Sequence, residues 1–328
     1  MGSLLPLLFL STVSSSHATH YINPTTPTTS CPTDPCSTLS EYGQQLLHNL
    51  TSNTKLLLLP GNHVLSANFT VENVSGFEIL SSAPTDSHAT RIVCQGFVGF
   101  SFRNISHVTM CGLTMSSCGK DAFINSYITT YGVSVYSVLY TSITDCSFQD
   151  NVGTALGVFH SRLDLRGSNN FTSNCRSCGD YTCLCFGGGI YARMSTLTIT
   201  GNNTFRVNSA SKGGVIAAEY SALNFTGIIA FENNSAEFGG GIYAQRSTLN
   251  FNGSSIFGNN SAAHSGGGIY IENNSTLNFS GNSSFGNNSA GFYGGGILAA
   301  NKVLMNFNGN SIFRNTILSL QAGGFVLC

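Results

Sequence analysis

The sequence predicts an all-β protein, a right-handed parallel β-helix solenoid of about ten turns with an N-terminal capping helix. Three observations support this fold: an internal repeat, glycine or asparagine at regular intervals, and the confinement of all seven prolines to positions up to Pro84. Proline cannot donate to a hydrogen-bonded ladder, so its absence from the rest of the chain favours continuous β pairing.

The internal repeat is marked by Phe-x-x-Asn at 148–151, 171–174, 205–208, 231–234, 257–260 and 285–288. The last four copies are spaced by 26, 26 and 28 residues, and clusters such as Gly-Gly-Gly-Ile recur in phase with them. Such a period is too short for a propeller blade and lacks the helical half of ankyrin or leucine-rich repeats. A β-helix turn made of three short strands fits this length.

Equivalent positions of successive turns should stack at about 4.8 Å and form ladders along the axis. The asparagines are expected at a bend, in the left-handed conformation, with their amides bonded to the next turn. The ladders are Ile190, Ile216, Ile242, Ile269 and Ile297; Leu197, Leu223, Leu249 and Leu277; Phe205, Phe231, Phe257, Phe285 and Phe313; and Asn208, Asn234, Asn260 and Asn288.

The chain divides into three predicted segments. Residues 1–18 contain a short apolar run ending in small residues, which is typical of a secretory signal peptide, and a buried helix is the alternative. Residues 19–54 form a leader, with a disulfide loop expected between Cys31 and Cys36 and a helix starting at a Thr38-x-x-Glu41 capping box. Residues 55–328 form the predicted β-helix.

The cysteines and sequons are consistent with a secreted, extracellular protein. The eleven cysteines fit an oxidising compartment, and their odd number leaves at least one thiol unpaired or paired with another chain, for which Cys328 is the expected residue. Cys175, Cys178, Cys183 and Cys185 are expected to form two disulfides, with a zinc site as the alternative. Sequons that permit N-glycosylation lie at Asn49, Asn68, Asn73, Asn104, Asn170, Asn202, Asn224, Asn233, Asn252, Asn259, Asn273, Asn274, Asn278, Asn282 and Asn287.

Over residues 146–328, the paired Gly-Gly-Gly-Ile and Phe-x-x-Asn markers resemble the repeats of the polymorphic outer-membrane proteins. Those proteins are adhesin-like autotransporter passengers with right-handed β-helices. The N-terminal portion, with Leu-Leu-Pro-Gly61 and residues 141–148, looks more like secreted animal proteins of the pectin-lyase-like kind. The resemblance implies a β-helix with a role in adhesion, and it does not extend to an outer-membrane anchor.

The composition argues against several classes of function. A formal net charge of −1 gives no electrostatic attraction to nucleic acid, and after the signal peptide no apolar window is long enough for a membrane span. Residues 187–192 match the dinucleotide fingerprint G-x-G-x-x-G/A, but strand-like sequence follows where the fingerprint requires a helix. We therefore expect no cofactor and no metal.

Catalysis has one candidate cluster. Polysaccharide lyases and hydrolases built on β-helices gather carboxylates from neighbouring turns. Here the best candidates are Asp145, Asp150 and Asp164, with Arg162 and Arg166. We favour turn positions for the first two aspartates and an outward position for the third, and so expect no catalytic residue. A carbohydrate-active enzyme, either a polysaccharide lyase or a glycoside hydrolase, is the alternative function.

A candidate contact strip is formed by Tyr191, Tyr243 and Tyr270. These tyrosines follow the inward isoleucines, so strand alternation turns them outward. They could stack on sugar rings or dock a protein, or simply pack on one another as a surface ladder. The predicted function is a non-enzymatic extracellular scaffold, an adhesion or recognition module whose partners are extracellular proteins or glycans.

The C-terminal end is a further expected contact region. Residues 323–326 begin a new turn close to the last residue of the sequence. We therefore expect a bare β edge with Ile297, Phe307 and Phe313, covered by additional chain or by a partner, with Cys328 as the linking thiol.

Overall fold

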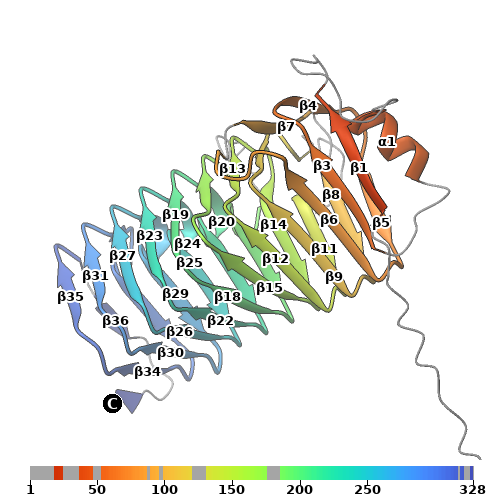
Figure 1. Ribbon diagram of the computed structural model, residues 1–328. Coiled ribbons are helices and arrows are strands. Elements are labelled where there is room, and N and C mark those ends of the chain that lie inside the picture. Colours follow the sequence, from red (N-terminus) through yellow and green to blue (C-terminus); the bar gives the residue numbers. More distant parts are fainter. Residues whose placement is uncertain are drawn as a thin grey trace, which may run out of the picture.

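A computed structural model describes residues 18–24, 37–46, 53–86, 89–95, 99–119, 131–175, 185–316, 318–320 and 326–327. The chain winds into an elongated solenoid whose turns stack in sequence order (Figure 1). Strands of successive turns pair in parallel and build three long sheets and one short sheet, which we name A, B, C and D. The predicted right-handed parallel β-helix is confirmed.

Sheet A has thirteen strands among the described residues, and β2 and β1 precede β3 in its order. Its strands are β1 (Ala18–Asn23), β2 (Ser37–Thr38), β3 (Thr54–Leu58), β6 (Gly76–Ser81), β9 (His107–Cys111), β12 (Tyr140–Thr144), β15 (Arg162–Arg166), β18 (Thr196–Ile199), β22 (Ala222–Phe225), β26 (Thr248–Phe251), β30 (Thr276–Phe279), β34 (Leu304–Phe307) and β37 (Val326–Leu327).

Sheets B and C have ten strands each in the described part of the chain, which agrees with the expected number of turns. Sheet B contains β4 (Gly61–Leu65), β7 (Thr90–Cys94), β10 (Thr114–Ser116), β13 (Ser147–Gln149), β16 (Asn170–Thr172), β19 (Asn202–Arg206), β23 (Ile228–Glu232), β27 (Ser254–Gly258), β31 (Ser283–Gly286) and β35 (Ser311–Arg314). Sheet C contains β5 (Phe69–Glu72), β8 (Phe100–Arg103), β11 (Tyr131–Tyr136), β14 (Thr154–Phe159), β17 (Ile190–Arg193), β21 (Ile216–Glu219), β25 (Ile242–Gln245), β29 (Ile269–Glu272), β33 (Ile297–Ala300) and β36 (Leu318–Leu320).

Among the described residues, sheet D lies in the repeated half of the chain. It contains β20 (Ser209–Lys212), β24 (Ser235–Phe238), β28 (Ser261–Ser265) and β32 (Ser289–Ala290). A regular turn therefore runs from sheet A to sheet B, then to sheet D, and reaches sheet C through a glycine bend. The sequence predicted three strands per turn, and the short strand of sheet D is the one that it missed.

The core is built from the predicted ladders. Phe231, Phe257 and Phe285 are fully buried and stack with ring centroids 4.6 Å apart at each step. The isoleucine and leucine ladders are also in register. Alternation along each short strand sends these side chains inward, so each turn buries its apolar residues against the turns on either side.

The asparagine ladder forms, but the prediction placed its backbone in the wrong conformation. The residue before each ladder asparagine takes the left-handed conformation, as Asn233 and Asn259 do at φ 56° and 53°. The ladder member Asn234 is buried, and its Nδ2 donates to the Phe205 carbonyl and to Asn260 Oδ1. The exposed residue makes the turn, which leaves the buried amide free to satisfy backbone groups inside the corner.

Only glycine fits at the bends between sheets D and C, because a Cβ atom would have no room there. At Gly213 the backbone has φ +63°, and a Cβ would lie 2.0 Å from the carbonyl oxygen of Ile216. Strand β21 follows this bend, not a helix. The glycines therefore serve a tight turn between sheets D and C.

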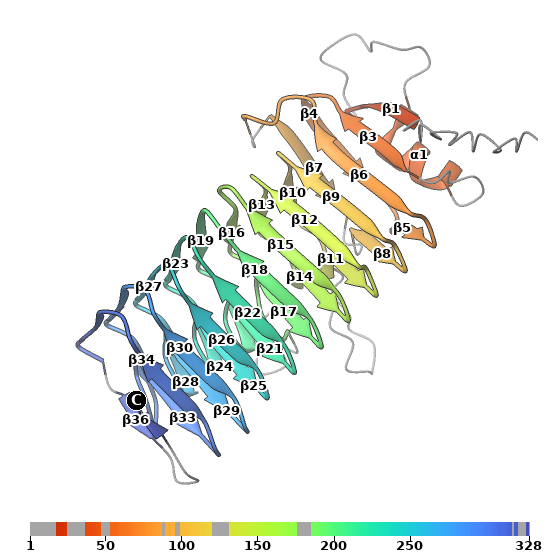
Figure 2. The ribbon, with the colours of Figure 1, turned by 60° about the horizontal axis from the view of Figure 1, so that its bottom comes forward.

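Helix α1 (Leu39–Leu46) begins at the predicted capping box, where the Thr38 amide donates to Glu41 Oε2 at 2.8 Å. Leu39 is buried, and Ser40 Oγ donates to the carbonyl of Val64 in β4. The helix lies at the N-terminal end of the stack (Figure 2). Its role as the cap stays a prediction, because β1 and β2 extend sheet A beyond β3.

Strand β1 begins at Ala18, the last residue of the predicted signal peptide, and otherwise lies in the predicted leader. It pairs with β3 in parallel from Ala18 opposite Thr54, and Ile22 is fully buried. The β-prone run His-Tyr-Ile is long enough to add one more strand to sheet A.

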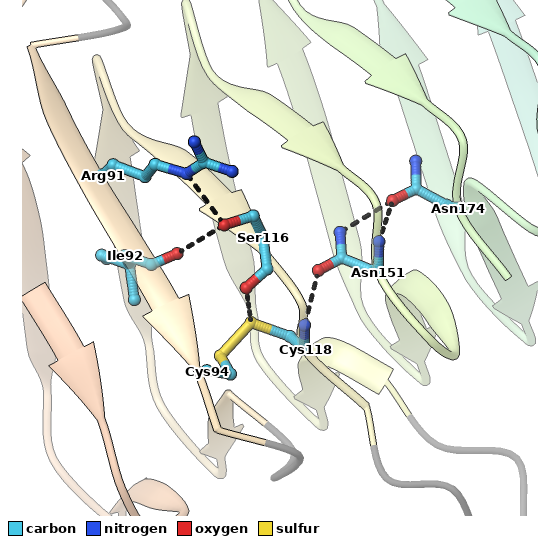
Figure 3. The surroundings of a disulfide bond; sticks show 7 residues. All are labelled: Arg91, Ile92, Cys94, Ser116, Cys118, Asn151 and Asn174. Carbon is cyan, nitrogen blue, oxygen red and sulfur yellow. Dashed lines mark hydrogen bonds between the residues drawn. A yellow bond between two sulfur atoms is a disulfide. The ribbon is translucent and has the colours of Figure 1, made fainter. Parts of the chain in front are cut away.

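Two disulfides lie among the described residues. Cys175–Cys185 is one disulfide within the four-cysteine cluster, for which the sequence predicted two disulfides without assigning the pairs. Cys94–Cys118 was not predicted, and it joins neighbouring turns (Figure 3). Its separation of 24 residues is close to one turn, which is the signal that could have found it. The other candidates, Cys31, Cys36, Cys178, Cys183 and Cys328, lie outside the described residues.

Cys111 and Cys146 are free thiols. Burial raises the pKa of Cys146 to about 12, so this residue stays a neutral thiol.

The last described strands add to two of the sheets. Strand β36 pairs with β33, and Ile297 is fully buried. Phe307 and Phe313 are half-buried and pack against the core. The expectation that Ile297 lies on a bare edge is therefore wrong, because Leu318 pairs directly with it.

Within the described ranges, the chain has no helix long and apolar enough to cross a membrane.

Candidate functional site

The strongest candidate site is the outer surface where sheets C and D meet. We call it the aromatic corner, and its rings are those of Tyr191, Tyr243, Tyr270, Phe186, Phe238, Phe292 and Tyr293. Tyr243 of β25 and Tyr270 of β29 are register partners, and their rings stack with centroids 5.5 Å apart. Tyr191 of β17 lies further along the same row. The structure thus brings all three tyrosines of the predicted strip into one line on the outer face of sheet C.

These tyrosines point outward but are not exposed, which corrects the expectation of a free surface strip. Tyr191 is 6% exposed and Tyr243 only 2%. The reason is the cover from sheet D and from Phe186, which forms a parallel bridge to Lys212 at the end of β20: Phe186 packs on Tyr191, and Phe238 of β24 packs edge-on to Tyr270. The tyrosines and these phenylalanines form a hydrophobic cluster outside the main core.

Two glutamates hold the tyrosine hydroxyls in place. Tyr243 Oη donates to Glu272 Oε1 at 2.6 Å, and Tyr270 Oη donates to Glu272 Oε2 at 3.2 Å. Tyr191 Oη donates to Glu219 Oε2 at 3.1 Å. A charged carboxylate accepting from a phenol makes a strong hydrogen bond, so the rings are fixed in orientation as well as in register.

Lys212 adds a cation to the corner. Its Nζ lies 4.7 Å from the centroid of the Tyr243 ring and 3.5 Å from Tyr243 Oη. The ammonium group is thus attracted both by the face of the ring and by the phenol oxygen.

Burial is the main cause of the altered acidity of these phenols. It raises the pKa of Tyr270 to about 12, with a smaller contribution from Glu272. Burial and the neighbouring glutamates raise the pKa of Tyr191 and Tyr243 further still. All three hydroxyls therefore stay protonated at physiological pH and act as hydrogen-bond donors, not as bases.

The aromatic corner becomes accessible to solvent toward the C-terminal turns. The imidazole of His264 packs between the rings of Phe238 and Phe292, with both centroid distances 4.7 Å. Phe292 is 69% exposed and Tyr293 is 49% exposed. The covered row of tyrosines thus continues into an accessible aromatic surface. The sequence pattern does not indicate this surface, because these rings lie beside strands of sheet D that were not predicted.

The aspartates considered for catalysis do not form one site. Asp145 and Asp150 take left-handed turn conformations at the two ends of β13, as expected, and Asp145 Oδ1 accepts from the Ser168 amide. Asp164 lies in the middle of β15. Among the described residues, no three His, Cys, Asp or Glu side chains gather in a manner that could hold a metal ion.

Asp164 is nearly buried under its neighbours. Its Oδ2 accepts from Tyr140 Oη at 3.0 Å and from Arg166 at 2.9 Å, and Arg162 lies 3.5 Å from Oδ1. Burial alone would raise the pKa of this carboxyl, but Arg166, Tyr140 and Arg162 together hold it below the usual value. The group is a fixed anion on the outer face of sheet A, engaged by two guanidinium groups.

A shallow cavity of about 360 Å³ lies at the corner between sheets C and A. Asn104, Ser137, Leu139 and His160 are among its lining residues. The residues around it offer amide, hydroxyl and imidazole groups, without a carboxylate.

The Chlamydia polymorphic membrane protein repeat family matches residues 228–245 and 254–272. These two stretches of the chain are similar to polymorphic membrane protein repeats. Each matched stretch begins with a strand of sheet B, passes through sheet D and ends with a strand of sheet C. The shared repeat is therefore the part of the turn that builds the aromatic corner, and it includes Tyr243 and Tyr270.

Two solved structures are similar to the chain, and no curated protein sequence matches it. The Agl-KA catalytic domain is 12% identical at a TM-score of 0.30, and the match covers 84% of this chain and 62% of that one. A mutant of the PL6 family alginate lyase AlyGC is 10% identical at a TM-score of 0.25, with coverage of 95% and 53%. The chain spans less than two thirds of either structure.

Proposed function

We propose that the protein is a secreted, non-enzymatic β-helix scaffold that recognises an extracellular glycan or protein through the aromatic corner. One observation carries this proposal: a row of rings held by Glu219 and Glu272 leads to the exposed rings of Phe292 and Tyr293. Aromatic rings fixed beside hydrogen-bonding groups suit the recognition of surfaces that are partly apolar and partly polar, as sugar rings and protein surfaces are.

The state of the carboxylates favours binding over catalysis. Asp164 is held by two arginines and a tyrosine, and the glutamates of the corner accept from tyrosine hydroxyls. A general acid must carry a proton near the working pH, whereas the pKa of Asp164 is lowered. These groups order the surface and do not act as an acid and base pair.

The first experiment applies the labelled protein to a glycan array and to intact cells, with and without glycosidase treatment of the cells. A glycan partner predicts array binding and loss after glycosidase treatment, and a protein partner predicts cell binding that survives it. The double variant F292S/Y293S should weaken binding by about tenfold or more. The matched control L139S changes another exposed apolar residue, which is 72% exposed, and should leave binding intact.

A second experiment addresses the enzyme alternative. The protein is incubated with pectin and alginate, with and without calcium, and newly formed chain ends are measured. We expect none. Chain cleavage that disappears in Asp164→Ala would overturn the proposal in favour of a carbohydrate-active enzyme.

A further inference from the structure

The left-handed corner between sheets B and D repeats one sequence on three turns. Asn-Asn-Ser stands at 233–235, 259–261 and 287–289, and in each copy the first asparagine begins a sequon. Asn233, Asn259 and Asn287 have φ values of 56°, 53° and 54°, and all three are exposed. The residues before them are register partners, so the three side chains stand one above another along the axis. We call them the corner row.

The two asparagines of each copy have different tasks. Asn260 is fully buried and holds the ladder, with its Nδ2 bonded to the Phe231 carbonyl and to Asn288 Oδ1. Asn259 turns the chain and points into solvent. Within the described part of the chain, the side-chain amides of Asn233 and Asn259 make no hydrogen bond, and Asn287 only accepts one, from Asn315. No described residue therefore engages Nδ2 of the corner row, which is the atom that a glycan would substitute.

We propose that Asn233, Asn259 and Asn287 are N-glycosylation sites, and that their glycans form a row along this corner. Sequons modified in secreted proteins lie on surface loops, and each of these asparagines lies on an exposed turn between two short strands. The glycosylation proposal and the proposed function have one assumption in common, which is that the chain enters the secretory pathway.

The sequons within sheet A provide the contrast. Asn278 lies in the middle of β30, half-buried, where its Nδ2 donates to Asn250 Oδ1 at 2.7 Å and its Oδ1 accepts from Asn306 Nδ2 at 2.7 Å. Its amide is packed between the neighbouring turns about 4.8 Å away on either side. A sugar at Asn278 would have to displace this ladder, so we expect this position to remain unmodified in the folded protein.

The distribution of sequons has a consequence for the aromatic corner. The strands of sheet D and those of sheet C from β14 to β33 contain no asparagine. The corner row directly precedes sheet D, and the sequons at Asn273 and Asn274 directly follow β29 of sheet C. Glycans on these corners would border the aromatic corner without covering it, and this surface would remain open to a partner.

The experiment uses the full chain behind a heterologous signal sequence in a glycosylating host, so that its outcome is independent of the protein's own leader. The secreted protein is treated with an amidase that removes N-glycans in heavy-oxygen water, and marked asparagines are located by mass spectrometry. We expect marks at the corner row and none at Asn278. In S261A the mark at Asn259 should disappear, and in S261T, which keeps the sequon, it should remain.

Absence of marks from all three corner asparagines would overturn the proposal, and so would a mark at Asn278 as strong as theirs. Neither result would bear on recognition by the aromatic corner, which the F292S/Y293S variant tests separately.

Discussion

The half of the chain before residue 175 and the half after residue 196 have the same order of long sheets but fill equivalent positions differently. On the inner face of sheet C, the later turns repeat isoleucine, as at Ile242 and Ile269. The earlier turns place Phe100, Val133 and Leu156 on the same ladder, and all are fully buried. The comparison teaches that alternation and corner geometry are sufficient for this fold, and that identical residues are not required for packing the core.

The polar ladders differ more than the apolar ones. The asparagine ladder ends at Asn151, whose Oδ1 accepts from the Cys118 amide (Figure 3). One turn earlier the disulfide Cys94–Cys118 holds the corner instead. A ladder of buried serines runs along the corner between sheets C and A, and its members are Ser161, Ser195, Ser221, Ser247 and Ser275. It likewise ends where Ser161 Oγ accepts from the Val138 amide, and Val138 is itself buried. Repeated polar side chains therefore stabilise the corners from Asn151 and Ser161 onward, and a covalent bond and apolar residues stabilise the corners before them.

The largest expected effect concerns the later half. Phe257→Ala removes a ring stacked between Phe231 and Phe285 and leaves a cavity between these two rings. We expect a loss of about 3 to 5 kcal/mol in the free energy of unfolding, measured by denaturant titration. The neighbouring Ile256 points outward and is exposed, so Ile256→Ala should cost less than about 1 kcal/mol. Equal losses in the two variants would contradict the register of β27.

The second prediction concerns the earlier half. Replacing both Cys94 and Cys118 with serine removes a bond that closes a loop with a sequence separation of 24 residues. The expected loss is about 2 to 4 kcal/mol. Hydrogen exchange should show faster opening near β7 and β10, while the amides of β27 and β31 keep their protection. Uniform loss of protection along the chain would mean that the two halves unfold as one unit.

The third prediction tests the buried asparagine ladder. Asn260→Ala leaves the Phe231 carbonyl and the Asn234 side-chain amide without their partner inside the corner. We expect a cost of about 1 to 3 kcal/mol, measured as above. Asn259→Asp changes the adjacent exposed residue and keeps a side chain that tolerates the left-handed conformation, so it should be close to neutral. A reversed order of the two effects would contradict the separation of roles at this corner.

The smallest effect is a pH dependence in the aromatic corner. The pKa of Tyr270 is about 12 in the folded chain, because of burial and Glu272, and about 10 in an unfolded chain. The folded state keeps a proton that the unfolded state releases between these values. Stability should therefore be unaffected by this group below about pH 10 and should fall as the pH rises toward about 12. In Tyr270→Phe this part of the decline should be absent, and an unchanged profile would contradict the burial of the phenol.

The repeated half could be predicted from the sequence because each turn repeats the same residues at the same spacing. The ladders through Ile216, Leu223 and Phe231 followed from the period alone. Cys94–Cys118 lies in turns whose residues do not repeat, so only the separation of one turn pointed to it.

The candidate site was only partly predictable. Strand alternation gave the outward direction of Tyr191 and Tyr243, but not their cover by sheet D. The strands of this sheet are only two to five residues long and precede a glycine bend, so periodicity does not reveal that they fold against sheet C. The pairing of tyrosines with Glu219 and Glu272 depends on contacts between turns, which one turn of sequence does not contain.

The central claim, recognition through the aromatic corner, is tested most directly by placing a removable glycan on it. Gln245 lies on the outer face of β25 in the register of Glu219 and Glu272, and Q245N creates a sequon because Ser247 is already present. Binding of the glycosylated variant to a ligand identified on the array is measured before and after enzymatic removal of its glycans, with wild type treated in parallel. We expect binding to be lost in the glycosylated variant and restored once the glycan is removed. Binding equal to wild type while the glycan is in place would contradict the claim.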